Sequence, residues 1–537
     1  MAGIVVSGGT YSGSGDVTTE FLYVLNSSST GGNGGAVHMP DGTFEVTGTN
    51  TVDYAGEGLT GYAVNLPRAG TLDTFNHGSG TFQFSNGAAF NSYMQYEFWW
   101  NVAMRATADI SGSATGDLTC ANDLVIGSGT LYHGTPAWNA GLTVSGMTFI
   151  SGGHLNAGTR AAGTDTRNLG SLYVANLGTF TTTAGNTYFR NWKTNDNYDT
   201  YGAGINGMSL MLEASCGFNA NSGTCIIKSE AGESRNYRYS IRSPGWDNVP
   251  YNLIIDKVGS NYPYSTTYHH IQNDFTVASG SSVWAAYGTK WQDPSAGSPR
   301  FTVSGNVLVS GTLDFINNGG GDDYKQQNVQ FGSLTVKAGG LYIAPGPANA
   351  TDLTLSGTTR IVGQDGNGYA IHTYSDVFEH SDGTVLLEPI VDTVLQAVYF
   401  NDNASPSSDA ELYNLVIHSG TAASVPNASW VRKVKVWNDL VVGPGRRFRP
   451  DTDDNVNYFL DVAGTATISG TLGHSSVWGG TAVPIRLGTL DIKSGGAYNA
   501  TSGTTIIKQP PVGAGKFYNL GTFTHNNGLV SLSGASQ

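Results

Sequence analysis

Charged residues are scarce in this sequence, since Asp, Glu, Lys and Arg together make up 12% of 537 residues, about half of their usual share. Lys and Glu favour helix surfaces, and no long stretch has the periodicity of an amphipathic helix. Glycine is abundant instead, with 74 residues, and Thr, Ser and Asn suit strand faces and tight turns. The composition therefore predicts an all-β protein with an uncharged polar surface.

Other absences exclude several classes of protein. The 26 basic residues are scattered and the net charge is −14, so we expect no nucleic-acid partner, which needs a clustered basic surface. The short run Arg446-Arg-Phe-Arg449 is the local exception and a candidate contact for an anionic partner. No apolar run reaches 18 residues, so no membrane-spanning helix is expected.

Cysteine is rare as well. Cys120, Cys216 and Cys225 are an odd set in a long chain, which argues against a disulfide framework and predicts buried free thiols. No Cys and His cluster has zinc-ligand spacing. The residues Met1 to Thr10 lack the basic segment and long apolar core of a signal peptide, so we expect no export by the general secretory route if Met1 is the native start.

The clearest pattern that is present lies between Phe301 and Phe315, where every second residue is apolar or glycine. Such alternation places one set of side chains on one face of a strand. Gly305 and Gly311 keep the phase, which predicts consecutive strands joined by tight bends. The pattern recurs at 460–472 and more loosely at 142–146, and the step along the chain from 142 to 301 equals the step from 301 to 460.

Several phrases also recur in one fixed order. They are Phe75-Asn-His-Gly-Ser-Gly-Thr81, which returns at Phe218, Phe378 and Phe523, Asn122-Asp-Leu-Val-Ile126 at Asn273 and Asn438, Leu169-Gly-Ser-Leu-Tyr-Val174 at Phe331 and Leu487, and Tyr251-Asn-Leu-Ile-Ile255 at Tyr413. This order predicts three internal super-repeats of about 150–160 residues. We expect an atypical N-terminal cap or attachment segment at 1–74, super-repeats at 75–217, 218–377 and 378–522, and the start of a truncated fourth repeat at 523–537.

Within one copy the phrases begin at regular intervals, at 251, 273, 301, 331, 353 and 378. These intervals match one turn of a parallel β-solenoid, or β-helix, of about 20–30 residues, so each super-repeat would hold about six turns. About twenty turns spaced by ~4.8 Å would form a rod on the order of 100 Å long. Three β-sandwich domains are the alternative. The solenoid is favoured because strand phase continues through single glycines and no linker separates the copies.

The phrases at 218–224, 413–417 and 142–146 resemble the repeats of large parallel β-solenoid surface proteins, which occur in bacterial adhesins and in structural proteins of marine bacteriophages. The resemblance covers most of 75–537 and is specific for architecture rather than activity. Together with the missing export signal, it implies a tail fibre, a tailspike or another virion appendage, located on the virion or an extracellular surface. Such appendages are commonly homotrimers. The resemblance therefore implies a homo-oligomer, other virion proteins as partners, and a glycan or protein receptor on the host surface.

Three functions follow from these expectations. The preferred one is a structural virion protein that forms a rigid rod and mediates host attachment. The second is a bacterial cell-surface adhesin whose export signal has been removed or lies elsewhere in a longer chain, and the third is a tailspike that degrades polysaccharide. The chain stops early in its fourth copy, so we expect either a longer polypeptide or a capping partner at that end.

Candidate chemistry lies in polar insertions. Glycoside hydrolysis needs two carboxylates about 5 to 10 Å apart, and a structural calcium ion, the one cofactor considered, needs six to eight oxygen ligands. The carboxylate candidates are Asp322, Asp323, Asp451 and Asp453 for catalysis, with Asp196, Asp199, Asp451, Asp453 and Asp454 for calcium. Catalysis is not favoured, because acidic residues are ordinary in polar loops.

Two aromatic regions are candidate binding sites. They contain Tyr93, Tyr96, Trp99 and Trp100 in the first and Tyr262, Tyr264 and Tyr268 in the second. Such rings stack on sugars in receptor sites, but they also form subunit contacts or fill a widened core, and these last two interpretations are favoured. The adjacent pair His269-His270 is not expected to clamp a metal, because neighbours on a strand point to opposite faces.

Overall fold

A computed structural model shows that every described element of the chain is a β-strand, and the described residues include no helix. The described residues are 4–6, 10–12, 15–24, 36–38, 42–47, 62–66, 75–76, 79–85, 90–94, 98–99, 101–105, 108–110, 118–133, 141–156, 167–190, 208–213, 215–228, 237–241, 249–256, 259–263, 269–285, 301–315, 329–337, 340–345, 358–362, 369–373, 378–380, 382–388, 396–400, 410–418, 423–424, 433–449, 459–473, 484–508 and 516–533. They belong to two units, Met1–Lys257 and Val258–Gln537.

Unit 1 is a parallel β-solenoid. One sheet takes one strand from each successive turn: β1 (Ile4–Val6), β4 (Leu22–Val24), β7 (Tyr62–Leu66), β10 (Phe90–Met94), β13 (Ala108–Ile110), β16 (Thr130–His133), β18 (His154–Asn156), β20 (Thr179–Thr181) and β23 (Gly217–Asn219). Leu118 pairs with Leu142, and Leu142 pairs with Arg167, so each of these positions lies one turn after the last. These turns fall within the predicted 20–30 residues, whereas Leu22 pairs with Val64 and Leu172 with Leu210, so other turns of unit 1 are longer.

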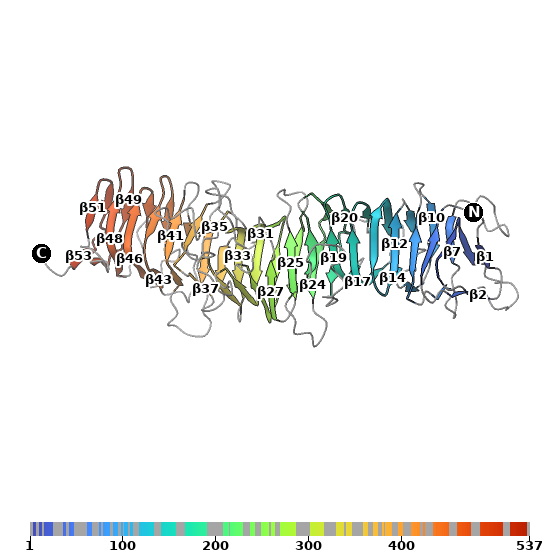
Figure 1. The fold of residues 1–537 in the computed structure, drawn as a ribbon. Helices are drawn as coiled ribbons and strands as arrows, with labels where there is room; N and C mark the ends of the chain where they lie inside the picture. Colours follow the sequence, from blue (N-terminus) through green and yellow to red (C-terminus); the bar gives the residue numbers. More distant parts are fainter. Residues whose placement is uncertain are drawn as a thin grey trace. The chain divides into compact units, whose positions relative to one another are not determined.

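The remaining strands of unit 1 complete the other sides of each turn (Figure 1, blue to green). They are β3 (Val17–Thr19), β6 (Thr43–Val46), β9 (Thr81–Phe84), β11 (Phe98–Trp99), β12 (Asn101–Arg105), β14 (Leu118–Cys120), β15 (Leu124–Ser128), β17 (Leu142–Ile150), β19 (Arg167–Val174), β21 (Asn186–Phe189), β22 (Met208–Leu212), β24 (Thr224–Lys228), β25 (Tyr237–Ile241) and β26 (Asn252–Asp256), with β2 (Thr10–Ser12), β5 (Ala36–His38) and β8 (Phe75–Asn76) in a small sheet.

Unit 2 repeats the same construction, also with parallel pairing between its described strands (Figure 1, light green to red). Its strands are β27 (Gly259–Pro263), β28 (His269–Ile271), β29 (Phe275–Val277), β30 (Ser281–Trp284), β31 (Phe301–Val309), β32 (Thr312–Asp314), β33 (Val329–Val336), β34 (Leu341–Ile343), β35 (Thr358–Ile361), β36 (Tyr369–Thr373), β37 (Phe378–Glu379), β38 (Thr384–Leu387), β39 (Gln396–Phe400), β40 (Ala410–Leu412), β41 (Asn414–Ile417), β42 (Ala423–Ser424), β43 (Lys433–Val436), β44 (Leu440–Val442), β45 (Arg447–Arg449), β46 (Phe459–Ile468), β47 (Thr471–Leu472), β48 (Ile485–Ile492), β49 (Ala497–Asn499), β50 (Thr504–Lys508), β51 (Phe517–Asn519), β52 (Thr522–Thr524) and β53 (Leu529–Ser533).

Parallel pairing from turn to turn confirms the solenoid and is incompatible with the sandwich alternative, whose sheets are antiparallel. The division into three super-repeats stays a prediction.

The alternating pattern of β31 places its apolar side chains inside. Val307 and Val309 are buried, whereas Leu308 between them is half-buried. The sequence predicts a bend between two strands at Gly305, and this prediction is wrong, because Gly305 lies within the continuous strand β31. The register of β31 against β33 shifts at this point, between Val303 and Asn306. The strand continues because the shift accommodates the close approach of the preceding turn without breaking the ladder.

The core is built from stacked apolar residues of neighbouring turns. In unit 2 the rings of Phe301, Phe315, Phe331 and Tyr342 lie with centroids 5.5 to 6.3 Å apart, mostly edge to face. Each fully buried side chain of this size contributes about 1.5–3 kcal/mol relative to exposure. Because every turn buries its face against the next, the solenoid gains stability by repetition.

The three cysteines are buried and unpaired with one another, as predicted. Burial raises the pKa of the Cys216 and Cys225 thiols to about 12. These thiols therefore stay protonated near neutral pH, and such buried cysteines are chemically inert.

Candidate functional site

The carboxylates proposed from the sequence as catalytic or calcium-binding residues all lie outside the described residues. They are Asp196, Asp199, Asp322, Asp323, Asp451, Asp453 and Asp454. Tyr96, Trp100, Tyr264 and Tyr268 lie outside them as well. Tyr93, Trp99 and Tyr262 are located on the backbones of β10, β11 and β27, but their side chains are not described. Catalysis, calcium binding and aromatic binding at these residues stay predictions.

Unit 1 has a polar corner at the recurring phrase that begins with Asn122-Asp123. Asn101 donates from Nδ2 to Thr81 Oγ1 at 3.3 Å and accepts at Oδ1 from Asn122 Nδ2 at 2.8 Å. The backbone N–H of Asp123 also donates to Asn101 Oδ1, at 3.1 Å. On the next turn, the N–H of Met147 donates to Asp123 Oδ1 at 2.8 Å. One polar ladder thus connects four successive turns.

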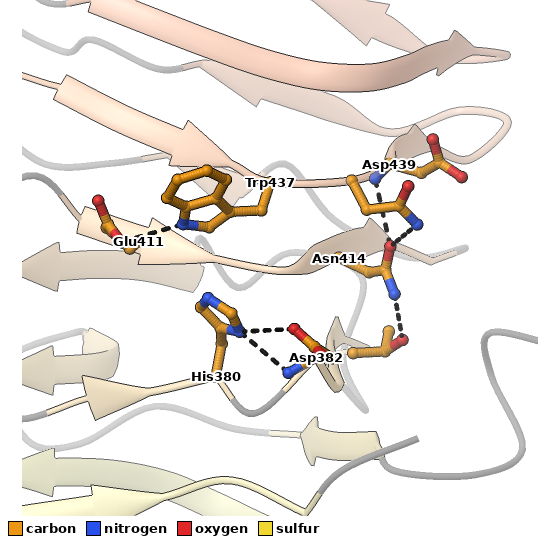
Figure 2. A network of polar contacts seen from close by, with 8 residues as sticks. His380, Asp382, Glu411, Asn414, Trp437 and Asp439 are labelled. Atoms are coloured by element: carbon orange, nitrogen blue, oxygen red, sulfur yellow. Dashed lines mark hydrogen bonds and ion pairs between the residues drawn. The ribbon is translucent and has the colours of Figure 1, made fainter. Parts of the chain in front are cut away.

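The same ladder recurs in unit 2 (Figure 2). Asn414 donates to Thr384 Oγ1 at 3.3 Å and accepts from Asn438 Nδ2 at 2.9 Å and from the N–H of Asp439 at 3.2 Å. The N–H of Thr465 donates to Asp439 Oδ1 at 2.7 Å. These bonds satisfy polar groups at the edge of the core, where an unpaired donor or acceptor would be costly.

Glycine is required where the next turn crosses this corner. Gly464 donates its N–H to the Asn438 carbonyl at 2.8 Å, and a Cβ on Gly464 would lie 2.6 Å from both Asn438 O and Asp439 Oδ1. The phrase that begins with Asn438-Asp439 ends at Gly445, whose φ of +71° favours glycine. The recurring Asn-Asp and Ser-Gly phrases are therefore corner chemistry rather than catalytic motifs.

A group of side chains lies beside the second ladder and makes contacts of a different kind. The Trp437 cluster consists of His380, Glu411, Tyr413, Lys435 and Trp437, and Figure 2 shows three of them next to the Asn414 ladder. Glu411 accepts from Trp437 Nε1 at 3.0 Å through Oε2 and from Lys435 Nζ at 3.1 Å through Oε1. Lys435 Nζ lies 3.1 Å from the centroid of the Trp437 ring. The indole is thus fixed at its edge by a carboxylate and on one face by an ammonium group.

The cluster spans three turns. His380 comes from the corner that precedes β38, and its ring lies 5.6 Å from that of Tyr413, which precedes β41. His380 Nδ1 accepts from the N–H of Asp382 at 3.0 Å, so its ring orientation is held by its own turn. Lys435 and Trp437 belong to the following turn, since the Trp437 N–H donates to the Leu412 carbonyl. Successive turns therefore contribute a row of polar and aromatic groups.

The ionisation of Glu411 follows from these contacts. Partial burial by itself raises the pKa of this carboxyl, but the hydrogen bonds from Trp437 and Lys435, together with the positive charge of Lys435, outweigh burial. The pKa lies below its ordinary value, so Glu411 is ionised near neutral pH and neutralises the neighbouring ammonium group. The net charge of the Glu411–Lys435 pair is therefore zero.

Trp437 is also unusual in its exposure. Its exposed fraction is 44%, whereas most large apolar side chains with a described environment are buried. Sequence reasoning missed this residue because it concentrated on dense aromatic runs. The usable signal was its position directly before the phrase Asn438-Asp439, where the other two copies carry Ala121 and Gln272.

Comparison of the chain with protein-family models, with curated proteins and with solved structures finds no match. Within the described ranges, no helix is long and apolar enough to cross a membrane. The same ranges contain no group of three or more His, Cys, Asp or Glu side chains arranged to hold a metal ion.

Proposed function

We propose that this chain is a structural protein of a virion appendage, of the fibre or spike type, which forms a rigid rod and attaches the particle to a host surface. The observation that carries the proposal is the parallel β-solenoid in both units. A fold of this kind is compatible with a fibre, a spike or an adhesin, and the resemblance of its repeated phrases to phage structural proteins supports the first two.

A fibre or spike has to resist bending, and the stacked turns of a solenoid make it stiff. Each turn buries its apolar face on its neighbours, and the corner ladders from Thr81 to Met147 and from Thr384 to Thr465 connect turns by side-chain hydrogen bonds. Bending the solenoid would lengthen these bonds at the corners. A stack fixed in this way transmits force along its length with little deformation.

The proposed setting is the outside of a virion, with the chain assembled as a homotrimer and joined to other virion proteins. The proposed receptor is a glycan or a protein of the host surface. Light scattering coupled to size-exclusion chromatography tests the oligomer, because one chain has a mass of 56.3 kDa and a trimer has three times that mass. A mass of one chain at micromolar concentration would contradict the trimer.

Electron microscopy of particles from the native source, labelled with an antibody against the chain, tests the proposed location. We expect label on projections from virions. Label on the cell envelope without any virion would replace the proposal with an adhesin. Release of reducing sugar from host polysaccharide by the purified protein would add the degrading activity of a tailspike.

A further inference from the structure

The corner ladder allows the same positions to be compared in different copies. The Thr-Asn-Asn-Asp geometry of Asn101 and of Asn414 agrees bond for bond. Since the scaffold is the same, differences between the side chains attached to it are not required by the fold. Any chemistry special to one copy is therefore a candidate for function.

The Trp437 cluster is special to one copy. Counting from the Asn-Asp pair, the positions of Lys435 and Trp437 are Thr119 and Ala121 in the first copy and His270 and Gln272 in the second. In the second copy Asn252 donates to Thr224 Oγ1 at 3.3 Å, as Asn101 does to Thr81 and Asn414 to Thr384. Counting from these asparagines, the position of Glu411 is Phe98 in the first copy and Val249 in the second. No described ladder other than that of Asn414 combines an exposed indole with a carboxylate and an ammonium group.

We propose that the Trp437 cluster binds a neutral β-linked glycan, with the exposed surface of the indole stacked on the apolar face of a pyranose ring. This inference rests on the proposed attachment function and names the class of receptor and its site. A β-linked hexose with equatorial hydroxyls has axial hydrogens on both faces, so its ring is flat and apolar above and below and polar around its rim. The cluster has the complementary arrangement of one ring bordered by hydrogen-bonding groups.

The geometry favours a sugar over other partners. The indole is already held at its edge by Glu411 and on one face by Lys435, so it loses little rotational freedom when a ligand binds. Each carboxylate oxygen of Glu411 accepts one of these two hydrogen bonds and keeps a lone pair for a sugar hydroxyl. The indole nevertheless keeps 44% of its surface exposed, so part of the ring is accessible to a ligand.

Charge favours a neutral glycan over a polyanion. Glu411 and Lys435 form an ion pair that neutralises both groups, and Asp382, which is 62% exposed, adds a negative charge close to His380. A sulfated or uronic-acid chain would find no unpaired cation in the Glu411–Lys435 pair, because the Lys435 ammonium group is already bound by Glu411. A protein interface of ordinary size needs an apolar centre much larger than one indole.

Calorimetric titration of the full chain with cellohexaose, laminarihexaose and chitohexaose tests the inference. We expect binding of at least one of these probes, unchanged by added salt. Trp437→Gln introduces the residue that stands at the equivalent position 272, and we expect it to weaken binding about tenfold or more. Trp437→Phe keeps a ring and should retain part of the affinity.

Two further variants separate a lost site from lost structure. Leu177→Asn removes another exposed apolar side chain, 81% exposed and in unit 1, and should bind like the native chain. Glu411→Gln keeps an acceptor for the indole but removes the ion pair with Lys435, and should weaken binding while leaving strand content unchanged by circular dichroism. Binding of no probe by the native chain, or equal binding by Trp437→Gln and native chain, overturns the inference.

The glycan-binding test and the test of the proposed virion function can fail independently of each other. Antibody-labelled virion projections without glycan binding would leave the appendage intact and remove the site. Glycan binding that depends on Trp437, with label only on cell envelopes, would keep the site and remove the virion role.

Discussion

His269 provides the sharpest test of how the turns of unit 2 are stacked. It lies in β28, its exposed fraction is 1%, and its ring centroid is 6.0 Å from that of Phe301 on the next turn. Burial, with a smaller effect from the adjacent His270, lowers the pKa of His269 from 6.5 to about 3. The native state therefore keeps this imidazole neutral under conditions in which the unfolded chain protonates it.

The sign and size of the effect follow from linkage. Between pH 6.5 and about pH 3 the unfolded chain binds a proton that the native state does not, so stability falls as the pH falls. Each pH unit in this window costs about 1.4 kcal/mol. The free energy of unfolding should therefore drop by about 3 kcal/mol between pH 7 and about pH 4.5 because of His269 alone.

The assay is urea denaturation of native chain and His269→Leu at both pH values. Leucine is suitable because Leu118 stands at the equivalent position of the first copy. We expect the variant to gain about 3 kcal/mol relative to the native chain on going from pH 7 to about pH 4.5. His525→Gln, at an exposed histidine, should show no comparable gain. A gain of zero for His269→Leu would mean that His269 is not buried against Phe301 and that the register of β28 on β31 is wrong.

Three other predictions address the corners and the core. Gly464→Ala should lower the free energy of unfolding by about 1–3 kcal/mol and so lower the melting temperature. Gly127→Ala is the control and should change the melting temperature little, because its Cβ would lie 3.7 Å from the nearest atom. Equal shifts of the melting temperature in the two variants would contradict the close approach at Gly464. Asn414→Ala should lower the free energy of unfolding, measured by urea denaturation, by about 1–3 kcal/mol, because the N–H of Asp439 loses its acceptor. An unchanged free energy of unfolding would show that the ladder does not stabilise the fold. Cys225 should react with a thiol reagent only after denaturation, and fast reaction of this thiol in the native chain would contradict its burial.

The fold was predictable because its signals are local. Strand alternation through Phe301–Phe315 and the spacing of recurring phrases both describe a chain that returns to the same face after each turn, and the parallel pairing of β31 with β33 confirms it. The corner glycines were predictable as sites of close approach. That Gly305 lies inside a continuous strand was not, because the sequence does not specify the register shift against the next turn.

The candidate site was not predictable from the sequence in the same way. Glu411 and Trp437 are separated by 26 positions and become neighbours only through the length of one turn. A difference of one residue in that length would move Glu411 to the opposite face of its strand. The acidic and aromatic candidates were chosen by density along the chain, which has no relation to which side chains meet across turns.

A cryo-electron-microscopy map of the purified chain tests the central claim most directly. The account predicts parallel strands in layers ~4.8 Å apart, with Glu411 and Trp437 on neighbouring layers and Asn414 bridging Thr384 and Asn438. A map of antiparallel sandwich domains, or of a solenoid in which these residues are not on successive layers, would contradict it.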